Sequence, residues 1–480
     1  MDFSRRSFIK ATGLTAAFGG LPLIIPSSVL SASAPSKLIH IGIIGCGRIS
    51  STFEIPSIIR LKNKARIVAL CDLDSKRLAK AKDRVERDYN KSLGMKNYRV
   101  KTYSCYRDLI ANPEIDAVMV CVPDHWHALC AAEVLLANKH LWLQKPFSQT
   151  IQEGRIVSAI ARMKKRVVQV GSQQRSSSQF HDCCELVRNG RIGAIKRIEV
   201  GLGIDRPGGS SKPMPVPPNL DYDTWLGPTP RAFYTETRVH TQNLDRIWSR
   251  PGWIQMAPYG WGMITNWGAH HMDIVQWGLG TEDSGPNEVS GTCKWMDTTH
   301  GKLWNVHTAY DLHFKYGKDT DVHVWNNYQN GVKFIGEKGE WLFCTRGAVR
   351  VTPSDPVQVK KPGHLSAYEA SDPKLMTKMK DPKYPLLISK NHFENWLDAI
   401  IADDPAATVT SAEHGHRSTS VCSLGQMCMK TGKTLKWNPD TETSDNAEAN
   451  EMLRPFARGK FNLALTLKRY GLDIKEFIKA

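Results

Sequence analysis

The chain has 480 residues, more than a single hydrophobic core ordinarily supports, and this length predicts two domains or three. Its 41% hydrophobic and 23% charged residues are ordinary for a globular protein and exclude a largely disordered chain. The net charge of +17 suggests nucleic acid or an acidic membrane surface as partners. However, the sequence has no block of five like charges and no basic stripe interleaved with aromatic residues, so we expect no nucleic-acid partner.

The cysteines and histidines predict neither a disulfide framework nor a metal site. The eleven cysteines are an odd number without a CxxC pair, and Cys46, Cys71 and Cys121 lie in apolar runs typical of strands. We therefore expect buried thiols. His414 and His416 stand close together, but no third ligand follows at a suitable spacing, so the sequence predicts no bound metal.

The N-terminus predicts an export signal. Residues 4–10 read Ser-Arg-Arg-Ser-Phe-Ile-Lys, the pattern of a twin-arginine signal. The apolar stretch at 11–25 is shorter than the roughly 20 residues that span a bilayer, and small residues around Ser33 fit a cleavage site. We expect residues 1–33 to be removed and the mature protein to be periplasmic, without membrane insertion. The alternative is an ordinary amphipathic N-terminal helix.

A dinucleotide-binding motif follows the signal. Residues 38–44 predict a strand, and the run Gly45-Cys46-Gly47-Arg48-Ile49-Ser50 precedes a helical pattern over 53–61 that Pro56 interrupts. In the order strand, glycine turn and helix, GxGxxG predicts dinucleotide binding; a purely structural turn is the alternative. Gly45 allows the tight turn, Gly47 lets a pyrophosphate approach the backbone, and Ser50 is a small replacement for the third glycine. We expect residues 45–49 to contact the cofactor.

An acidic residue stands where a ribose-binding carboxylate is expected. The strand predicted at 65–71 ends at Asp72, about 25 residues after Gly47 and near the usual spacing of roughly 20. The charge of Asp72 would repel a 2′-phosphate, which favours NAD over NADP, although Arg77 lies near enough to keep NADP open as the less favoured cofactor.

Two further strands end in polar motifs. The apolar run at 117–122 is followed by Pro123-Asp124-His125-Trp126-His127, and the strand at 140–143 is followed by Gln144-Lys145-Pro146. Ligands of doubly wound sheets bind beyond the carboxyl ends of the strands, so we expect Pro123, Asp124, His127, Gln144 and Lys145 to face the cofactor. His125 and Gln174 are weaker candidates. Strands and helices alternate throughout, which predicts an α/β fold with a parallel sheet.

These motifs, in this order and spacing, resemble the Gfo/Idh/MocA oxidoreductase family. The resemblance continues at 169–175, 187–193 and 220–228, and through Gly-Ala-His-His-Met-Asp at 268–273, which matches the family's GxHxxD motif. It extends to a late helix at 413–417 and so covers nearly all of the mature chain.

The resemblance implies two domains. It implies an N-terminal Rossmann domain with a doubly wound parallel sheet at 37–170 and a substrate and oligomerisation domain at 171–437. The second is an α/β domain with a large, mostly antiparallel open sheet, and a homo-oligomer, a dimer or tetramer, is expected. Residues 196–200, 308–314 and 321–325 partly alternate polar and apolar, as half-buried strands do. Residues 438–480 are expected to form a polar linker and a C-terminal helix.

The resemblance also implies the catalytic residues. The Lys145 ammonium would lie between the nicotinamide and the substrate hydroxyl and stabilise the developing alkoxide. His270 is the expected general base, since imidazole titrates near working pH. Two family acids are replaced, one by Gln144 and one by Asn266, which leaves Lys145 and His270 as the catalytic pair. Arg175, Asn266 and His271 are lower-ranked substrate contacts.

The sequence therefore predicts an exported oxidoreductase that acts on a sugar, glycoside or polyol. Free nicotinamide cofactor is scarce outside the cytoplasm, so we expect NAD to be held tightly and reoxidised in place by a second sugar. Oxidation at C3 of a glycoside is one specific case. The main alternative is a glycosidase that uses NAD transiently to oxidise, eliminate, add water and reduce. A non-catalytic sugar-binding protein is a further alternative, because Gln144 and Asn266 replace acids.

Overall fold

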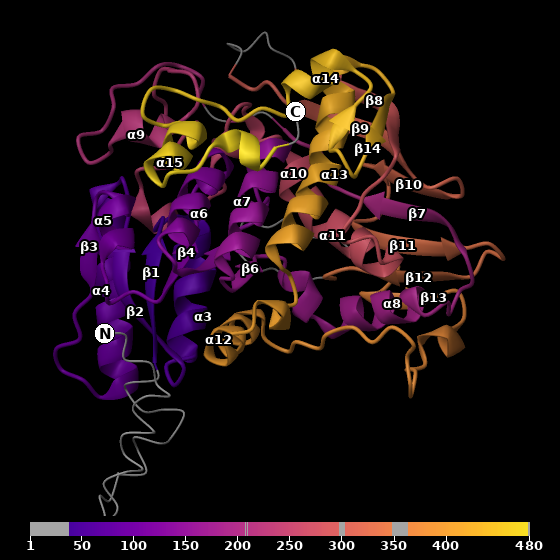
Figure 1. Cartoon of the computed structure of the whole chain (residues 1–480), viewed down its shortest axis with the longest axis horizontal. Coiled ribbons are helices and arrows are strands. Elements are labelled where there is room, and N and C mark those ends of the chain that lie inside the picture. Colours follow the sequence, from indigo (N-terminus) through magenta and orange to yellow (C-terminus); the bar gives the residue numbers. More distant parts are fainter. Residues whose placement is uncertain (1–37, 207, 209, 297–302, 348–362, 479–480) are drawn as a thin grey trace, which may run out of the picture. The chain divides into compact units, whose positions relative to one another are not determined.

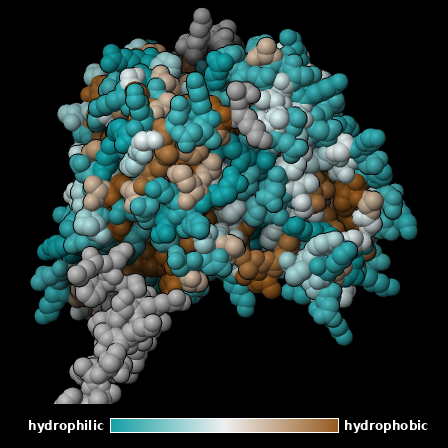
Figure 2. Space-filling view, viewed as in Figure 1, coloured by the Kyte–Doolittle hydropathy of each residue, from teal (hydrophilic) through white to brown (hydrophobic). Residues whose placement is uncertain are grey.

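The computed structural model describes residues 38–206, 208, 210–296, 303–347 and 363–478. The predicted export signal at 1–33 lies outside the described residues, so the structure does not test it. Within the part that is described, no helix is long and apolar enough to cross a membrane. The face drawn in Figure 2 is mostly hydrophilic, with apolar side chains in small separate patches.

The first domain is built on a six-stranded parallel sheet in the order β3-β2-β1-β4-β5-β6. This order confirms the predicted Rossmann topology. The strands are β1 (Ile39–Ile44), β2 (Ala65–Cys71), β3 (Lys101–Tyr103), β4 (Ala117–Val120), β5 (His140–Leu143) and β6 (Val168–Val170).

Helices cover both faces of this sheet, because successive side chains of its buried strands point to opposite sides. In β4, Ala117 and Met119 pack into one core and Val118 and Val120 into another. The first core is covered by α3 (Ile55–Arg60), α4 (Ser75–Leu93) and α12 (His392–Ala402). The second is covered by α5 (Tyr106–Ala111), α6 (His127–Leu136), α7 (Ile151–Lys164) and α15 (Leu463–Arg469).

Two of these covering helices come from far along the chain. Figure 1 shows α12 beside α3, and α15 near α6. The last strand of the sheet, β6, ends at Val170. Two helices that cover the sheet, α12 and α15, nevertheless come from regions that the sequence analysis assigned after residue 170. The local sequence of these helices does not show which surface their apolar faces pack against.

The helix after the glycine turn is continuous, although a break at Pro56 was expected. A π-helical turn, η2 (Ser50–Glu54), runs directly into α3, in which Pro56 occupies the first turn. Proline has no N–H to donate and its ring crowds the preceding turn. A wider turn at this point accommodates that defect without ending the helix.

The second domain is built on a nine-stranded sheet in the order β13-β12-β11-β7-β10-β9-β8-β14-β15. Only the β7–β10 pair is parallel among the described pairings, which confirms the predicted mostly antiparallel sheet. The strands are β7 (Ile195–Gly201), β8 (Glu288–Trp295), β9 (His307–Tyr316), β10 (Thr320–Trp325), β11 (Gly331–Gly336), β12 (Trp341–Cys344), β13 (Tyr368–Ala370), β14 (Leu435–Asn438) and β15 (Thr443–Ser444).

Three helices pack on one face of this sheet: α8 (Ser178–Arg188), α11 (Gly268–Leu279) and α13 (Ala412–Thr431). Alternate strand residues such as Leu312 and Phe314 of β9 point into that core, while Asp311 and His313 point to the opposite, more polar face. The shorter helices are α9 (Tyr222–Leu226), α10 (Met263–Asn266) and α14 (Ala447–Glu451). The stretch predicted as a linker from 438 contains β15 and α14.

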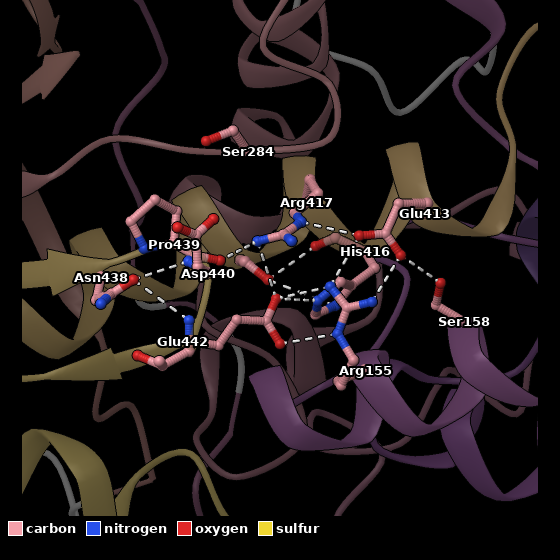
Figure 3. A network of polar contacts seen from close by, with 12 residues as sticks. Arg155, Ser158, Ser284, Glu413, His416, Arg417, Asn438, Pro439, Asp440 and Glu442 are labelled. Carbon is pink, nitrogen blue, oxygen red and sulfur yellow. Dashed lines mark hydrogen bonds and ion pairs between the residues drawn. The ribbon is translucent and has the colours of Figure 1, made fainter. Parts of the chain in front are cut away.

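A buried polar network fastens the C-terminal segment to both domains (Figure 3). Arg155 of α7 pairs with Glu413 of α13 at 2.7 Å and with Glu442, in the turn between β14 and β15, at 2.9 Å. His416 and Arg417 of α13 contact the same Glu442 carboxylate. His416 is therefore a structural residue with a carboxylate partner. All eleven cysteines are free, as predicted.

Candidate active site

A cleft lies at the carboxyl ends of β1, β2, β4 and β5, as expected for a doubly wound sheet. Its opposite wall comes from the second domain, through α10, α11 and the chain around residues 224–254. One end, here called the ribose end, is lined by Asp72, Leu73, Arg77 and His240. The other, the catalytic end, is lined by Asp124, Lys145, Asn266, His270 and Arg346.

The glycine turn between the two ends fits a dinucleotide. Gly45 has φ +94°, and a Cβ there would lie 2.5 Å from the carbonyl oxygen of Cys121, so only glycine suits the position. A Cβ at Gly47 would meet no atom within 4 Å, and this residue lines the cleft. The open cradle at Gly47, next to the first turn of the following helix, is where a pyrophosphate would bind. Arg48 and Ile49 line the same stretch.

At the ribose end, Asp72 stands where the sequence places it. Its carboxylate accepts from the backbone N–H of Cys46 at 2.6 Å and of Asp74 at 2.8 Å, and it faces the cleft. Burial raises the pKa of Asp72, against the effect of these hydrogen bonds. Arg77 lies beside it and donates to the carbonyl of Thr241 at 2.8 Å. The ribose end can therefore hold NAD through Asp72.

A segment of the second domain, residues 219–244, crosses the first domain here and is called the crossing segment below. Asp74 is its anchor. The carboxylate lies 2.9 Å from His240 Nε2 and accepts from Asn219 at 2.8 Å and Gln242 at 3.2 Å. Burial raises the pKa of Asp74, but the contacts with His240 and Asn219 outweigh it and hold the pKa well below its ordinary value.

Other contacts extend this attachment along the crossing segment. Lys80 donates to the carbonyl of Leu244 at 2.6 Å, and the backbone N–H of Ser75 donates to Asn219. At α9, the carbonyl of Trp225 lies 2.8 Å from His125 Nε2 and accepts from Trp126 at 3.0 Å. His125 is thus occupied in joining the domains and is not among the residues lining the cleft.

At the catalytic end, the structure brings Lys145 and His270 to the same part of the cleft. Lys145 Nζ donates to the carbonyl of Asn266 at 2.7 Å. Burial lowers the pKa of Lys145 to about 7, opposed by Asp124 and reinforced by Arg250, Arg346 and Arg48. Burial, followed by the charges of Arg346 and Lys145, holds the pKa of His270 well below its ordinary value, so its imidazole is neutral at pH 7.

Gln144 is tied to a buried carboxylate that the sequence did not reveal. Its side-chain nitrogen donates to Glu54 Oε1 at 2.6 Å, and Trp142 donates to the same oxygen at 2.7 Å. Cys121 donates to the other oxygen of Glu54. Glu54 is fully buried, and burial raises its pKa. A buried acid, Glu54, is thus hydrogen-bonded to Gln144, the residue that precedes Lys145 in the chain.

The remaining residues predicted to contact the cofactor also line the cleft, but they differ in whether their side chains are already hydrogen-bonded within the protein. Pro123 and Asp124 lie just beyond β4. Both ring nitrogens of His127 are held by backbone carbonyls, that of Pro146 at 2.6 Å and that of Val122 at 3.0 Å. Because these contacts occupy the ring, His127 shapes the wall of the cleft.

Two predicted substrate residues are not brought to the cleft. His271 is buried on the far side of α11, with Nε2 3.0 Å from Asn330 Oδ1. Arg175 is buried in ion pairs with Asp273 at 2.7 Å and Glu282 at 2.5 Å. Asn266, the third, does line the catalytic end, and its Oδ1 accepts from Arg250.

The sequence missed several residues at the catalytic end. Arg346, just after β12, has its guanidinium centre 4.8 Å from the ring centroid of Trp267, which also lines the cleft. Arg250 contacts Asn266 from an irregular loop. No local motif marks either arginine, because both reach the site through the folding of the second domain.

Among the described residues, one cluster outside the cleft consists of side chains that could bind a metal ion. Asp311, His313 and His323 lie on the polar face of the nine-stranded sheet with donor atoms within 4.8 Å of one another. His323 Nε2 lies 2.7 Å from Asp311, and its Nδ1 lies 2.7 Å from the hydroxyl of Tyr328. Both ring nitrogens are thus already hydrogen-bonded, which favours a polar network.

Two models of one oxidoreductase family match the chain. Residues 39–172 match the family's NAD-binding Rossmann fold, and residues 208–339 match its C-terminal alpha/beta domain. The chain belongs to the Gfo/Idh/MocA oxidoreductase family. The resemblance seen in the sequence is therefore confirmed, as are the fold class and the NAD-binding domain.

Individual relatives match over part of their length. The uncharacterized oxidoreductase YrbE of Bacillus subtilis is 30% identical over 211 residues, which are 44% of this chain and 54% of YrbE. Glycosyl hydrolase family 109 protein 2 of Shewanella sp. (strain ANA-3) is 31% identical over 165 residues, 32% of this chain and 35% of that protein. The chain thus spans about half or less of the length of these curated relatives.

Among solved structures, an aldose-aldose oxidoreductase from Caulobacter crescentus superposes with a TM-score of 0.56. It is 16% identical, and the match covers 83% of this chain and 99% of that chain. At this identity the likeness shows the shared fold.

Proposed function

We propose that this chain transfers hydride between a tightly held NAD and a secondary hydroxyl group of a sugar, glycoside or polyol. The observation that supports this proposal most strongly is that residues of both domains line one cleft. Lys145 and His270 come from different domains and meet at its catalytic end, while the glycine turn and Asp72 form the dinucleotide cradle. A hydroxyl group placed between Lys145 and His270 would lie at the nicotinamide end of such a cradle.

His270 is neutral at pH 7, and Lys145, with a pKa of about 7, is charged below that pH. The neutral imidazole of His270 takes the hydroxyl proton, and the Lys145 ammonium stabilises the negative charge that develops on that oxygen. NAD, when bound, would supply the hydride acceptor for the carbon that carries this hydroxyl group. The carbonyl of Asn266 holds Lys145 in place at 2.7 Å.

The crossing segment supports the proposal that NAD does not exchange. Its residues Val239 and His240 line the cleft, and Asp74, Arg77 and Lys80 fasten it to α4 and the residues before it. We therefore expect release of a dinucleotide to require these contacts to open. A second sugar, whose carbonyl takes back the hydride and a proton, would then complete the cycle. This scheme suits a periplasmic protein, and we propose that location from the twin-arginine signal.

A second candidate is an NAD-dependent glycosidase. The relative that favours it is the glycosyl hydrolase family 109 protein, 31% identical over 165 residues. Oxidation at C3 of a glycoside would acidify the neighbouring C–H and allow the glycosidic bond to eliminate, after which water addition and reduction restore the sugar. Release of free sugar without accumulation of a keto product would select this function, whereas accumulation of a keto product would select the oxidoreductase.

The proposal is tested on protein purified without added cofactor. We expect NAD to co-purify and its reduced form to appear by absorbance when a glycoside is added. A protein that neither retains nor binds NAD would overturn the proposed function and leave the non-catalytic alternative.

The protein is also proposed to be a dimer or tetramer, in which the polar face of the nine-stranded sheet forms the contact between subunits.

A further inference from the structure

One buried acid contacts two residues of the cleft wall, and the hydride transfer proposed above does not use it. Glu54, the last residue of η2, is fully buried and lies outside the cleft lining. It is hydrogen-bonded to Gln144 and to Cys121, which both line the cleft, and to Trp142 of β5. The acid therefore holds the cleft wall from behind, next to Lys145.

The contact with Trp142 decides which end of the Gln144 amide faces Glu54. An indole N–H can only donate, so Glu54 Oε1, which lies 2.7 Å from it, is an acceptor. Gln144 reaches the same oxygen at 2.6 Å, so its NH2 group makes that contact. This assignment holds for both protonation states of Glu54, because a proton on the acid would lie on Oε2, beside Cys121.

The other end of the amide, the carbonyl oxygen of Gln144, has no partner of its own. Within the part of the chain that the structure describes, no group donates a hydrogen bond to Gln144 Oε1. Gly171 packs against the amide, since a Cβ there would lie 2.9 Å from Oε1 and 3.1 Å from Nε2. Because Gln144 lines the cleft and Glu54 lies behind it, Oε1 is the atom that the amide offers to a ligand.

The group that binds to this oxygen must be a hydrogen-bond donor. Gln144 precedes Lys145 at the end of β5, where the nicotinamide of the proposed cofactor would bind. The carboxamide of nicotinamide carries an NH2 group, which is the donor that the cofactor has close to its reacting carbon. An acceptor that is already oriented by the protein loses little conformational entropy when this group binds.

We propose that Gln144 accepts a hydrogen bond from the carboxamide NH2 of bound nicotinamide, and that Glu54 is the positioning residue that directs the Gln144 oxygen toward it. This inference rests on the proposed function. The role assigned to Glu54 depends on its acceptor oxygen and not on its charge. An amide side chain at position 54 should therefore replace it, whereas an aliphatic side chain should not.

The test is a competition between two dinucleotides on the full chain. Acetylpyridine adenine dinucleotide has a methyl ketone where NAD has the carboxamide, so it lacks the NH2 donor. The protein is exchanged to equilibrium with an equal mixture of the two, and the bound dinucleotides are extracted and counted by mass spectrometry. We expect ~5- to 100-fold more NAD than analogue, because the analogue leaves Gln144 Oε1 without a donor.

Variants separate the orientation of the amide from the charge of the acid. Gln144→Met and Glu54→Leu should each remove most of the preference for NAD. Glu54→Gln should keep it, because an amide oxygen that accepts from Trp142 can also accept from Gln144. Gln152→Met, the same exchange on α7 outside the cleft lining, should keep it as well. If Glu54→Leu does not fold, Gln144→Met and Glu54→Gln still decide the result.

Three results would overturn the inference. The unaltered protein could bind both dinucleotides equally, or the preference for NAD could persist in Gln144→Met. In the third, Glu54→Gln loses the preference as fully as Glu54→Leu, which would make the charge of Glu54 the deciding feature. Failure of the proposed function looks different, because NAD would then be bound with the expected preference but reduced by no sugar. Recovery of neither dinucleotide would overturn both proposals.

Discussion

The ribose end and the catalytic end of the cleft are held together by different kinds of interaction. At the ribose end, one buried acid, Asp74, gathers His240, Asn219 and Gln242 from the crossing segment. At the catalytic end, Lys145 of the first domain donates to the carbonyl of Asn266 of the second domain at 2.7 Å, and the guanidinium of Arg346 lies over the ring of Trp267. A carboxylate with three side-chain partners therefore ties the two domains together beside the ribose end, as a cofactor that stays bound would require.

The largest expected effect is at the catalytic end. His270→Ala and Lys145→Met should each slow reduction of the bound NAD by ~100- to 10,000-fold, the usual worth of a general base or a placed cation. The NAD content should be unchanged. His271→Gln is the matched control, since His271 is the neighbour of His270 on α11 but contacts Asn330 outside the cleft lining. Single-turnover absorbance measures the rate, and a wild-type rate in either variant would remove that residue from the mechanism.

The next effect is at the ribose end. Asp74→Asn removes the charge that accepts three side-chain contacts from the crossing segment, so we expect NAD to dissociate ~10- to 100-fold faster, as for the loss of charge-assisted hydrogen bonds. A cofactor-exchange chase measures the rate. Asp83→Asn, on the exposed side of the same helix α4, should release NAD as slowly as the unaltered protein. Equal release from both variants would contradict the anchoring role of Asp74.

The pH dependence of hydride transfer separates the two catalytic residues. Burial lowers the pKa of Lys145 to about 7, so the ammonium is present below that pH and is lost above it. Because the charged form is the active one, the single-turnover rate should fall up to ~10-fold per pH unit above about pH 7. In Lys145→Arg the fall should disappear. A rate that rises through pH 7 would instead make the neutral amine of Lys145 the base.

The smallest effect concerns Gln144. Gln144→Glu places a second carboxylate 2.6 Å from Glu54, so we expect the free energy of unfolding to drop by about 1–3 kcal/mol. The double variant, Glu54→Gln combined with Gln144→Glu, should recover most of that lost stability, because one acid and one amide are again paired. Denaturant titration of the three variants measures it. No recovery in the double variant would show that the two side chains are not coupled.

Much of the cleft could be predicted from the sequence because its parts are local. The glycine turn, Asp72 and the ends of the parallel strands each have a short motif. Lys145 and His270 came from the family resemblance, and the structure places both in the cleft.

What could not be predicted depends on contacts between distant residues. Glu54 has no motif, and its burial against Gln144 depends on the π-helical turn that precedes Pro56. Arg346 and the crossing segment reach the cleft from the second domain. Arg175 and His271 were plausible ligands by residue type, but their partners, Asp273 and Asn330, lie far from them in the sequence or in another element of the second domain.

The most direct measurement follows deuterium from substrate to cofactor. Gel-filtered protein, with no NAD added, is mixed with a glycoside deuterated at the ring carbons that bear hydroxyl groups, and the extracted nicotinamide is weighed by mass spectrometry. We expect reduced cofactor that carries one deuterium, in an amount close to one per chain. Extracted cofactor without deuterium, or no cofactor at all, would contradict hydride transfer within a retained dinucleotide complex.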